Sequence, residues 1–188
     1  MNNIHPRAVL SCCGRIASLV LFLLVMLQTA TIFGQKQPVV AGGSLAGGEG
    51  GSSSGWVIAI HGGAGGPGPG GLSKEAEEQY MSKLNEALGA GSRILAEGGS
   101  SLDAVEEVVR FLEDCPLFNA GRGAVLNADG KVELDAAIMD GSSGMAGAVA
   151  AVSGIINPVS AERQVMEKTK HVMLVGPAAE EFAASAGQ

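Results

Sequence analysis

A glycine-rich turn at residues 58–71, IAIHGGAGGPGPGG, contains the first spacing in this chain that could support chemistry. Residues 63–68 satisfy G-x-G-x-x-G, the spacing of a turn that surrounds a dinucleotide pyrophosphate. The same turn begins with His61-Gly62-Gly63, in which glycines allow a backbone to approach a neighbouring segment closely. The same residues therefore fit two hypotheses, a dinucleotide-binding turn and a glycine loop that lies close to a neighbouring segment.

The context of this turn argues against a nucleotide. Pro67 and Pro69 remove two backbone donors from a loop that should supply them, and the next helix is predicted to start only at Ser73. The acidic residue that contacts a ribose is expected about 20 residues further on. That distance reaches Glu86, in the middle of the predicted helix, and no Gly-Lys-Ser or Gly-Lys-Thr of a phosphate loop is present. Nucleotide binding remains the weakest hypothesis.

Other titratable residues give no catalytic pair. Asp135 and Asp140 are five residues apart in or after a strand, which predicts opposite faces and solvated or turn-capping roles. His61 has no partner carboxylate nearby in the sequence and is expected to be a packed, hydrogen-bonded residue at a strand end. Cys115 follows two acidic residues, which disfavours a thiolate and predicts a buried, apolar role.

Composition divides the chain into three parts. Residues 1–34 have a positive start and a short apolar run, which predicts a secretory signal and export to the periplasm or the cell exterior; an uncleaved membrane anchor is the alternative. Residues 35–55 are rich in Gly and Ser and predict a flexible linker. Residues 56–188 hold the remaining apolar pattern. The net charge of −7 argues against a nucleic-acid partner.

Periodicity within residues 56–188 predicts a layered α/β sandwich. Ser73 and Ser100 are predicted caps of two successive helices, the first ending near Glu97 and the second burying Leu102, Val105, Val109 and Leu112. A hairpin turn is predicted at residues 127–130. The predicted strands are 56–60, 124–126, 131–139, 147–153 and 171–175, and the later helices are 159–168 and 178–186.

Three stretches in this order resemble one known family. They are AIHGGAG (59–65), LEDCPLFNAGRGAVLNADGKVELDAAIMDG (112–141) and AGAVAAVSGIINPVSAERQVMEKTKHVMLVG (146–176). Together they resemble the α-subunit of plant-type L-asparaginase/isoaspartyl peptidase, an N-terminal nucleophile hydrolase. The resemblance implies an αββα sandwich of which only the N-terminal half is present. It also implies hydrolysis of the side-chain amide of L-asparagine, or of β-aspartyl peptides, after autocleavage before a Thr whose amine acts as the base.

The resemblance also implies roles for residues of this chain. Asn119 matches a residue close to the nucleophile, with a turn-forming role as the alternative, and Gly62 and Gly63 match the glycine loop beside it. No organic cofactor is implied. A structural sodium ion is implied, bound by backbone carbonyls; a turn shaped by Pro116 and glycines without metal is the alternative. The carbonyls are those of Leu112, Glu113, Cys115, Phe118, Ala120 and Arg122.

The nucleophile of that family has no counterpart here. The threonines are Thr29, Thr31 and Thr169, and none follows the Gly of an autocleavage site. We therefore expect this chain to be inactive alone and to need a C-terminal β-subunit half, with a dimer of αβ units as the complete enzyme. The alternative is a non-catalytic secreted remnant or binding module that retains the half-fold.

Overall fold

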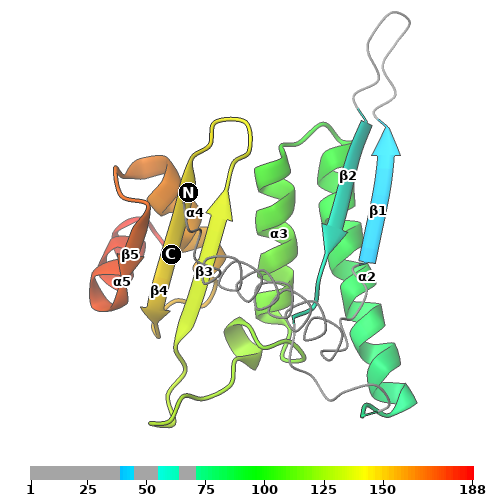
Figure 1. Cartoon of the computed structure of the whole chain (residues 1–188), viewed down its shortest axis with the longest axis horizontal. Coiled ribbons are helices and arrows are strands. Elements are labelled where there is room, and N and C mark those ends of the chain that lie inside the picture. The colour runs from blue at the N-terminus through cyan, green and yellow to red at the C-terminus, as the bar shows by residue number, and fades with distance from the viewer. Residues whose placement is uncertain (1–38, 45–54, 64–70) are drawn as a thin grey trace, which may run out of the picture. The chain divides into compact units, whose positions relative to one another are not determined.

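The structure is a computed structural model of the whole chain, and it describes residues 39–44, 55–63 and 71–188 (Figure 1). The predicted signal at 1–34 lies outside these residues. One compact unit comprises residues 36–63 and 73–188. Among the described residues, no helix is long and apolar enough to cross a membrane.

Strands β1 (Val39–Ser44) and β2 (Gly55–Ile60) form a two-stranded antiparallel sheet, with Val39 opposite Ile60. Composition predicted a flexible linker over 35–55, whereas β1 lies within that range. Main-chain pairing explains the difference, because ladder hydrogen bonds form without large side chains. Strand β2 matches the predicted strand 56–60, and Ile58 and Ile60 are its buried residues.

Helix α2 (Lys74–Ala96) begins where its cap predicts, because the Ser73 side chain accepts a hydrogen bond from the backbone N–H of Ala76. Its buried face includes Leu84, Leu88 and Leu95, as the periodicity predicted. Gly91 lies on the same face and permits close packing. A Cβ built there would lie 2.6 Å from Val108 Cγ2 and 2.8 Å from Ile58 Cδ1.

Helix α3 (Ser101–Asp114) starts with a capping box in which Ser100 and Asp103 exchange hydrogen bonds. The predicted inward stripe is wrong at Val105, which is exposed. The fully buried apolar residues of α3 are instead Ala104 and Val108. The small Ala104 and the facing glycine of α2 bring the two helices close together, which turns the neighbouring valine outward.

The second half of the chain forms a three-stranded sheet in the order β3-β4-β5. Strands β3 and β4 are antiparallel, and β4 and β5 are parallel. Helices α4 and α5 follow β4 and β5 respectively and pack on one face of this sheet, where their side chains share a core with Leu134, Val149 and Val152. The bounds are β3 (Leu134–Met139), β4 (Ala146–Val152), α4 (Pro158–Lys168), β5 (Met173–Val175) and α5 (Gly176–Ser185).

The predicted hairpin around 127–130 is wrong in one strand. The turn exists, because Asn127 and Gly130 are hydrogen-bonded across it, but residues 124–126 form no strand, and Val125 and Leu126 are exposed. The antiparallel partner of β3 is β4 instead. A short apolar run next to a strong turn looks like a strand in sequence, yet here it passes along the surface after the 3-10 turn η1 (Gly121–Gly123).

The face of the β3-β4-β5 sheet opposite α4 and α5 carries small and apolar side chains together with the exposed Asp135. Register places Ala137 beside Ala148 and Ala148 beside Met173, so these side chains form a row across the three strands. Met139 and Val175 flank this row and are exposed. The described residues thus form a mixed α/β structure whose small sheet is packed on one side only.

Candidate active site

The glycine turn that follows β2 lies against the loop that follows α3. A Cβ built on Gly62 would lie 3.1 Å from Phe118 Cε1 and 3.3 Å from Leu84 Cδ2, so a glycine here permits the contact. Gly63 has a φ of +96° and open space around it. The structure thereby brings together the predicted glycine loop and the residue preceding Asn119.

His61 differs from its prediction. Its Nδ1 accepts a hydrogen bond from the backbone N–H of Gly63 at 3.1 Å, as expected of a hydrogen-bonded residue, but its side chain is exposed rather than packed. The imidazole bonds to a backbone amide only two residues away, so it is held against its own turn at the surface. This bond shapes the glycine turn and gives His61 no carboxylate partner among the described residues.

The side-chain amide of Asn119 is hydrogen-bonded through its oxygen. Its Oδ1 accepts a hydrogen bond from the backbone N–H of Val125 at 2.9 Å, and among the described residues no other hydrogen bond involves this side chain. The amide nitrogen is therefore left to donate elsewhere. Phe118, next to it, is buried and makes an edge-to-face contact with Tyr80, with ring centroids 5.6 Å apart.

The loop between α3 and η1 folds back closely enough for carbonyl oxygens to converge on two glycines. A Cβ on Gly123 would collide with the carbonyl oxygens of Phe118 and Pro116, and a Cβ on Gly121 would collide with that of Glu113. Only glycine fits these positions. Backbone carbonyl oxygens suit hard cations in general, and the sodium ion of this loop remains a prediction.

Four of the six carbonyls predicted as sodium ligands already accept a backbone hydrogen bond. Those of Leu112, Cys115, Phe118 and Ala120 each accept one backbone hydrogen bond within the loop, which leaves one lone pair on each oxygen. No cluster of three or more His, Cys, Asp or Glu side chains among the described residues could hold a metal. The predicted set of carbonyl ligands stays a prediction.

Two carboxyl groups, Glu113 of α3 and Glu162 of α4, are buried. Burial raises the pKa of Glu113 to about 7, although hydrogen bonds from Val159 and Asn157 partly oppose the shift. Burial raises the pKa of Glu162 to about 8, and the nearby charges of Glu113 and Glu106 add to the shift. One carboxyl oxygen of Glu162 has no hydrogen-bond partner. Sequence periodicity gave no sign of these buried acids, because it ranks Glu as a surface residue.

The acidic residues away from the loop have structural roles. Asp135 accepts a hydrogen bond from the backbone N–H of Ala151 at 2.8 Å, where β4 bulges and Ala151 has a φ of 52°. Asp140 accepts hydrogen bonds from Ser142 and Ser143, which lower the pKa of its carboxyl to about 2. Asp140 confirms the expected turn-capping role, whereas Asp135 is exposed, as the solvated alternative expected, and bonds to the bulge of β4.

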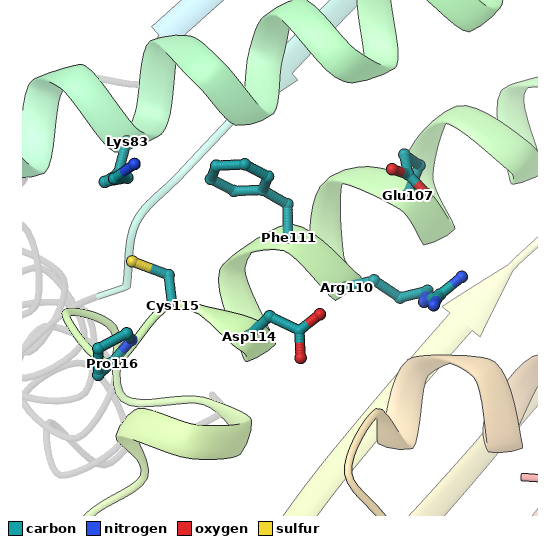
Figure 2. A pocket seen from close by; sticks show the side chains of 7 residues that line it. All are labelled: Lys83, Glu107, Arg110, Phe111, Asp114, Cys115 and Pro116. Carbon is teal, nitrogen blue, oxygen red and sulfur yellow. The ribbon is translucent and has the colours of Figure 1, made fainter.

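Figure 2 shows a cavity of about 350 Å³ between α2 and the end of α3. The Nζ of Lys83 lies 6.0 Å from the centroid of the Phe111 ring, and the buried, free Cys115 lies beside them. Acidic and basic side chains are equally represented, so the lining favours no single charge. The lining residues are Lys83, Glu107, Arg110, Phe111, Asp114, Cys115 and Pro116.

Comparisons with known proteins identify the family. The family model described as asparaginase matches residues 54–188. The chain is 53% identical over 131 residues to an isoaspartyl peptidase of Salmonella typhimurium, covering 70% of this chain and 42% of the relative. It is 49% identical over 131 residues to the human isoaspartyl peptidase/L-asparaginase, covering 70% and 41%. It is 52% identical over 128 residues to a plant-type L-asparaginase of Pyrococcus abyssi, covering 68% and 40%.

The matched region includes every residue that was predicted to belong to the site, from the glycine turn to the loop around Asn119. The chain spans about two-fifths of the length of these curated relatives. The mixed α/β structure accords with the N-terminal nucleophile hydrolase fold of the family. This chain therefore belongs to the asparaginase family.

Proposed function

We propose that this chain forms the N-terminal, α-subunit part of an amidohydrolase that acts on β-aspartyl peptides or L-asparagine. Relatives with about half of their matched residues identical are named isoaspartyl peptidases or L-asparaginases. The observation that carries the proposal is the contact of Gly62 with Phe118, because it brings the glycine turn next to the loop that bears Asn119. These are the segments that the family resemblance implies beside the nucleophile.

The nucleophile is proposed to come from a part of the family sequence that this chain does not match. Thr169, the one threonine among the described residues, is engaged as a helix cap. Its Oγ1 donates to the carbonyl of Val165 at 2.8 Å and accepts from the backbone N–H of His171 at 3.0 Å. A threonine inside the chain has no free α-amine to serve as its base. The chain is accordingly proposed to be inactive alone.

Within the assembled site, residues of this chain would position and bind rather than attack. The nucleophile's own amine would take the proton of the Thr hydroxyl as that hydroxyl attacks the amide carbon. Among the described residues no hydrogen bond engages the amide nitrogen of Asn119, and in the assembled site it would donate toward the nucleophile or toward the oxygen that becomes negative in the reaction. The backbone of Gly62 and Gly63 leaves room for the nucleophile's segment to approach.

The exposed face of the β3-β4-β5 sheet supports an αββα sandwich. Met139 is 65% exposed and Met173 is 53% exposed, although both lie in strands. A second sheet packed on this face would cover them, as sheets stack about 10 Å apart in sandwiches. We propose that this second layer is completed by the β-subunit half. Autocleavage, export and a dimer of αβ units are part of the same proposal.

A structural sodium ion is proposed for the loop between α3 and η1. The crowding of the carbonyls of Phe118 and Pro116 around Gly123 supports such a cradle. Bound there, the ion would neutralise carbonyl dipoles and fix the loop that carries Asn119. No catalytic step is assigned to it.

The proposal can be tested by supplying the remainder of the enzyme. The full chain is produced together with the part of the Salmonella typhimurium isoaspartyl peptidase that lies beyond the segment matched here. We expect co-purification, cleavage of the added segment before its Thr, and aspartate release from a β-aspartyl dipeptide and from L-asparagine. Asn119→Ala should lower turnover without preventing co-purification. An assembled, cleaved complex that releases no aspartate would favour the non-catalytic alternative.

A further inference from the structure

Helix α4 begins without a cap of its own. Asn157 is the residue at its N-cap, and its side chain makes no capping hydrogen bond to the helix. The carboxylate of Glu113 takes this place from the end of α3. Its Oε1 accepts a hydrogen bond from the backbone N–H of Val159 at 3.1 Å, and its Oε2 accepts one from Asn157 Nδ2 at 3.3 Å. A carboxylate at a helix N-terminus satisfies an orphan donor and complements the helix dipole.

The backbone of the same residue supports the loop that follows. A Cβ on Gly121 would collide with the carbonyl oxygen of Glu113 and lie 2.8 Å from its Cβ, so the returning loop rests directly on Glu113. Glu113 is 3% exposed. The returning loop packs against its backbone, and the start of α4 bonds to its side chain. Asn119 lies between Glu113 and Gly121 along the chain. Its position therefore depends on the point where the loop is anchored.

Apolar packing does not provide an alternative anchor between α3 and α4. The two hydrophobic clusters of the structure are separate, one built on β2, α2 and α3 and the other on β3, β4, α4 and α5. Hydrogen bonds and ion pairs join α3 and α4: Ser160 Oγ donates to Glu106 at 2.6 Å, and Arg163 pairs with Glu106 and Asp103 at 2.7 Å each. These contacts involve the middle and the start of α3. At the C-terminal end of α3, Glu113 accepts the bond from the Val159 backbone, and Asp114 Oδ1 shares the Asn157 amide with it at 3.4 Å.

We propose that Glu113 is a positioning residue: its side chain docks the loop of residues 112–123, and with it Asn119, onto the first turn of α4. It touches no substrate and acts through the loop. Loss of the carboxylate leaves the Val159 amide without its acceptor and at the same time removes the attachment of the loop to α4. The consequence for catalysis rests on the proposed function, whereas the docking itself does not.

The test compares Glu113→Ala and Glu113→Gln with Glu107→Ala in the full chain, purified alone or with the relative's C-terminal segment. Gln keeps an oxygen that can accept from Val159 but cannot accept from Asn157 through its nitrogen. Glu107 is an exposed carboxylate on the same helix and serves as the matched control. Hydrogen exchange is measured for peptides covering 112–126, 157–168 and 80–95. Turnover and KM for a β-aspartyl dipeptide are measured on the complex.

We expect Glu113→Ala to speed exchange about tenfold or more in 112–126 and at the start of 157–168, with 80–95 unchanged, because the buried hydrogen bonds from Val159 and Asn157 lose their acceptor. Glu113→Gln should restore only part of the protection, because its oxygen still accepts from Val159 but its nitrogen cannot accept from Asn157, and Glu107→Ala should match the parent. In an active complex, Glu113→Ala should lower kcat more than tenfold with KM within about threefold, and Gln should recover part of it. If Glu113→Ala does not fold, the Gln variant decides through faster exchange confined to the same two peptides.

Unchanged exchange in both peptides for Glu113→Ala would overturn the proposal, as would equal acceleration in all three peptides, which indicates general destabilisation. Equal protection in the Gln variant and the parent together with an unfolded Ala variant would assign Glu113 a merely space-filling role. If the parent complex is inactive, the proposed function fails, while the exchange pattern still decides the role of Glu113.

Discussion

Glu162 makes the stability of this chain depend on pH in a predictable direction. Its side chain is 1% exposed, and one carboxyl oxygen has no hydrogen-bond partner. Burial raises the pKa of Glu162 from 4.5 to about 8, with smaller contributions from the nearby Glu113 and Glu106. A carboxyl whose folded pKa lies above its unfolded value binds more protons when folded. Its contribution to stability is therefore complete below the unfolded pKa and is lost as pH rises through the folded pKa.

The magnitude follows from proton linkage. One such group lowers the free energy of unfolding by up to about 1.4 kcal/mol per pH unit between its two pKa values. Between pH 5 and pH 8 the loss at Glu162 is on the order of 3 kcal/mol. Glu113, whose pKa is raised to about 7, titrates in the same direction below pH 7. Glu162→Gln should remove only the pH dependence that Glu162 contributes. The free energy of unfolding of the variant should then fall less steeply with pH and level off near pH 7.

The assay is thermal or urea unfolding of the full chain and of Glu162→Gln, in the same assembly state, at intervals from pH 5 to pH 8. The variant should unfold at a similar midpoint at pH 5, and at pH 8 its Tm should be higher by roughly 10 °C. Glu162→Leu, which removes the unsatisfied oxygen, should also be more stable than the parent at pH 8. Parallel pH profiles for the parent and the Gln variant would refute the reasoning, because Glu162 would then not be a buried, titrating group.

Two glycine substitutions test the packing of the helices and of the loop. Gly91→Ala should destabilise the chain by about 1–3 kcal/mol, because its Cβ meets Val108; Gly89→Ala, with open space on the same helix, should be neutral or stabilising. Thermal unfolding that ranks these two variants in the opposite order would contradict the packing. Gly123→Ala should disorder the loop, since its Cβ meets the rigid carbonyl of Phe118. Hydrogen exchange faster at 112–126 than elsewhere is the expected result, and unchanged exchange is the contrary one.

Local sequence signals, such as helix caps, predicted much of the fold. Ser73 and Ser100 determine where α2 and α3 start through hydrogen bonds within three residues, and such caps can be recognised from sequence. The sequence patterns were wrong where tertiary contacts determine which residues are buried and which strands pair. Val105 faces outward because the close approach of α2 and α3 selects a different stripe, and residues 124–126 find no strand partner.

The site was predictable to a lesser degree. Gly62, Gly63 and Asn119 were identified through family resemblance, and the structure adds the contact with Phe118 that relates them. The capping of α4 by Glu113 joins segments 46 residues apart and has no signature in either segment. The missing side-chain cap at the start of α4 was the one available clue, and it shows only once the helix is built.

Aspartate release by the full chain in complex with the relative's C-terminal segment tests the central claim most directly. The account predicts that neither part alone hydrolyses a β-aspartyl dipeptide and that the purified, cleaved complex does. Activity of the full chain by itself would contradict the claim that its nucleophile lies outside these residues. A cleaved and stable complex without any aspartate release would contradict the claim that these residues form part of an amidohydrolase site.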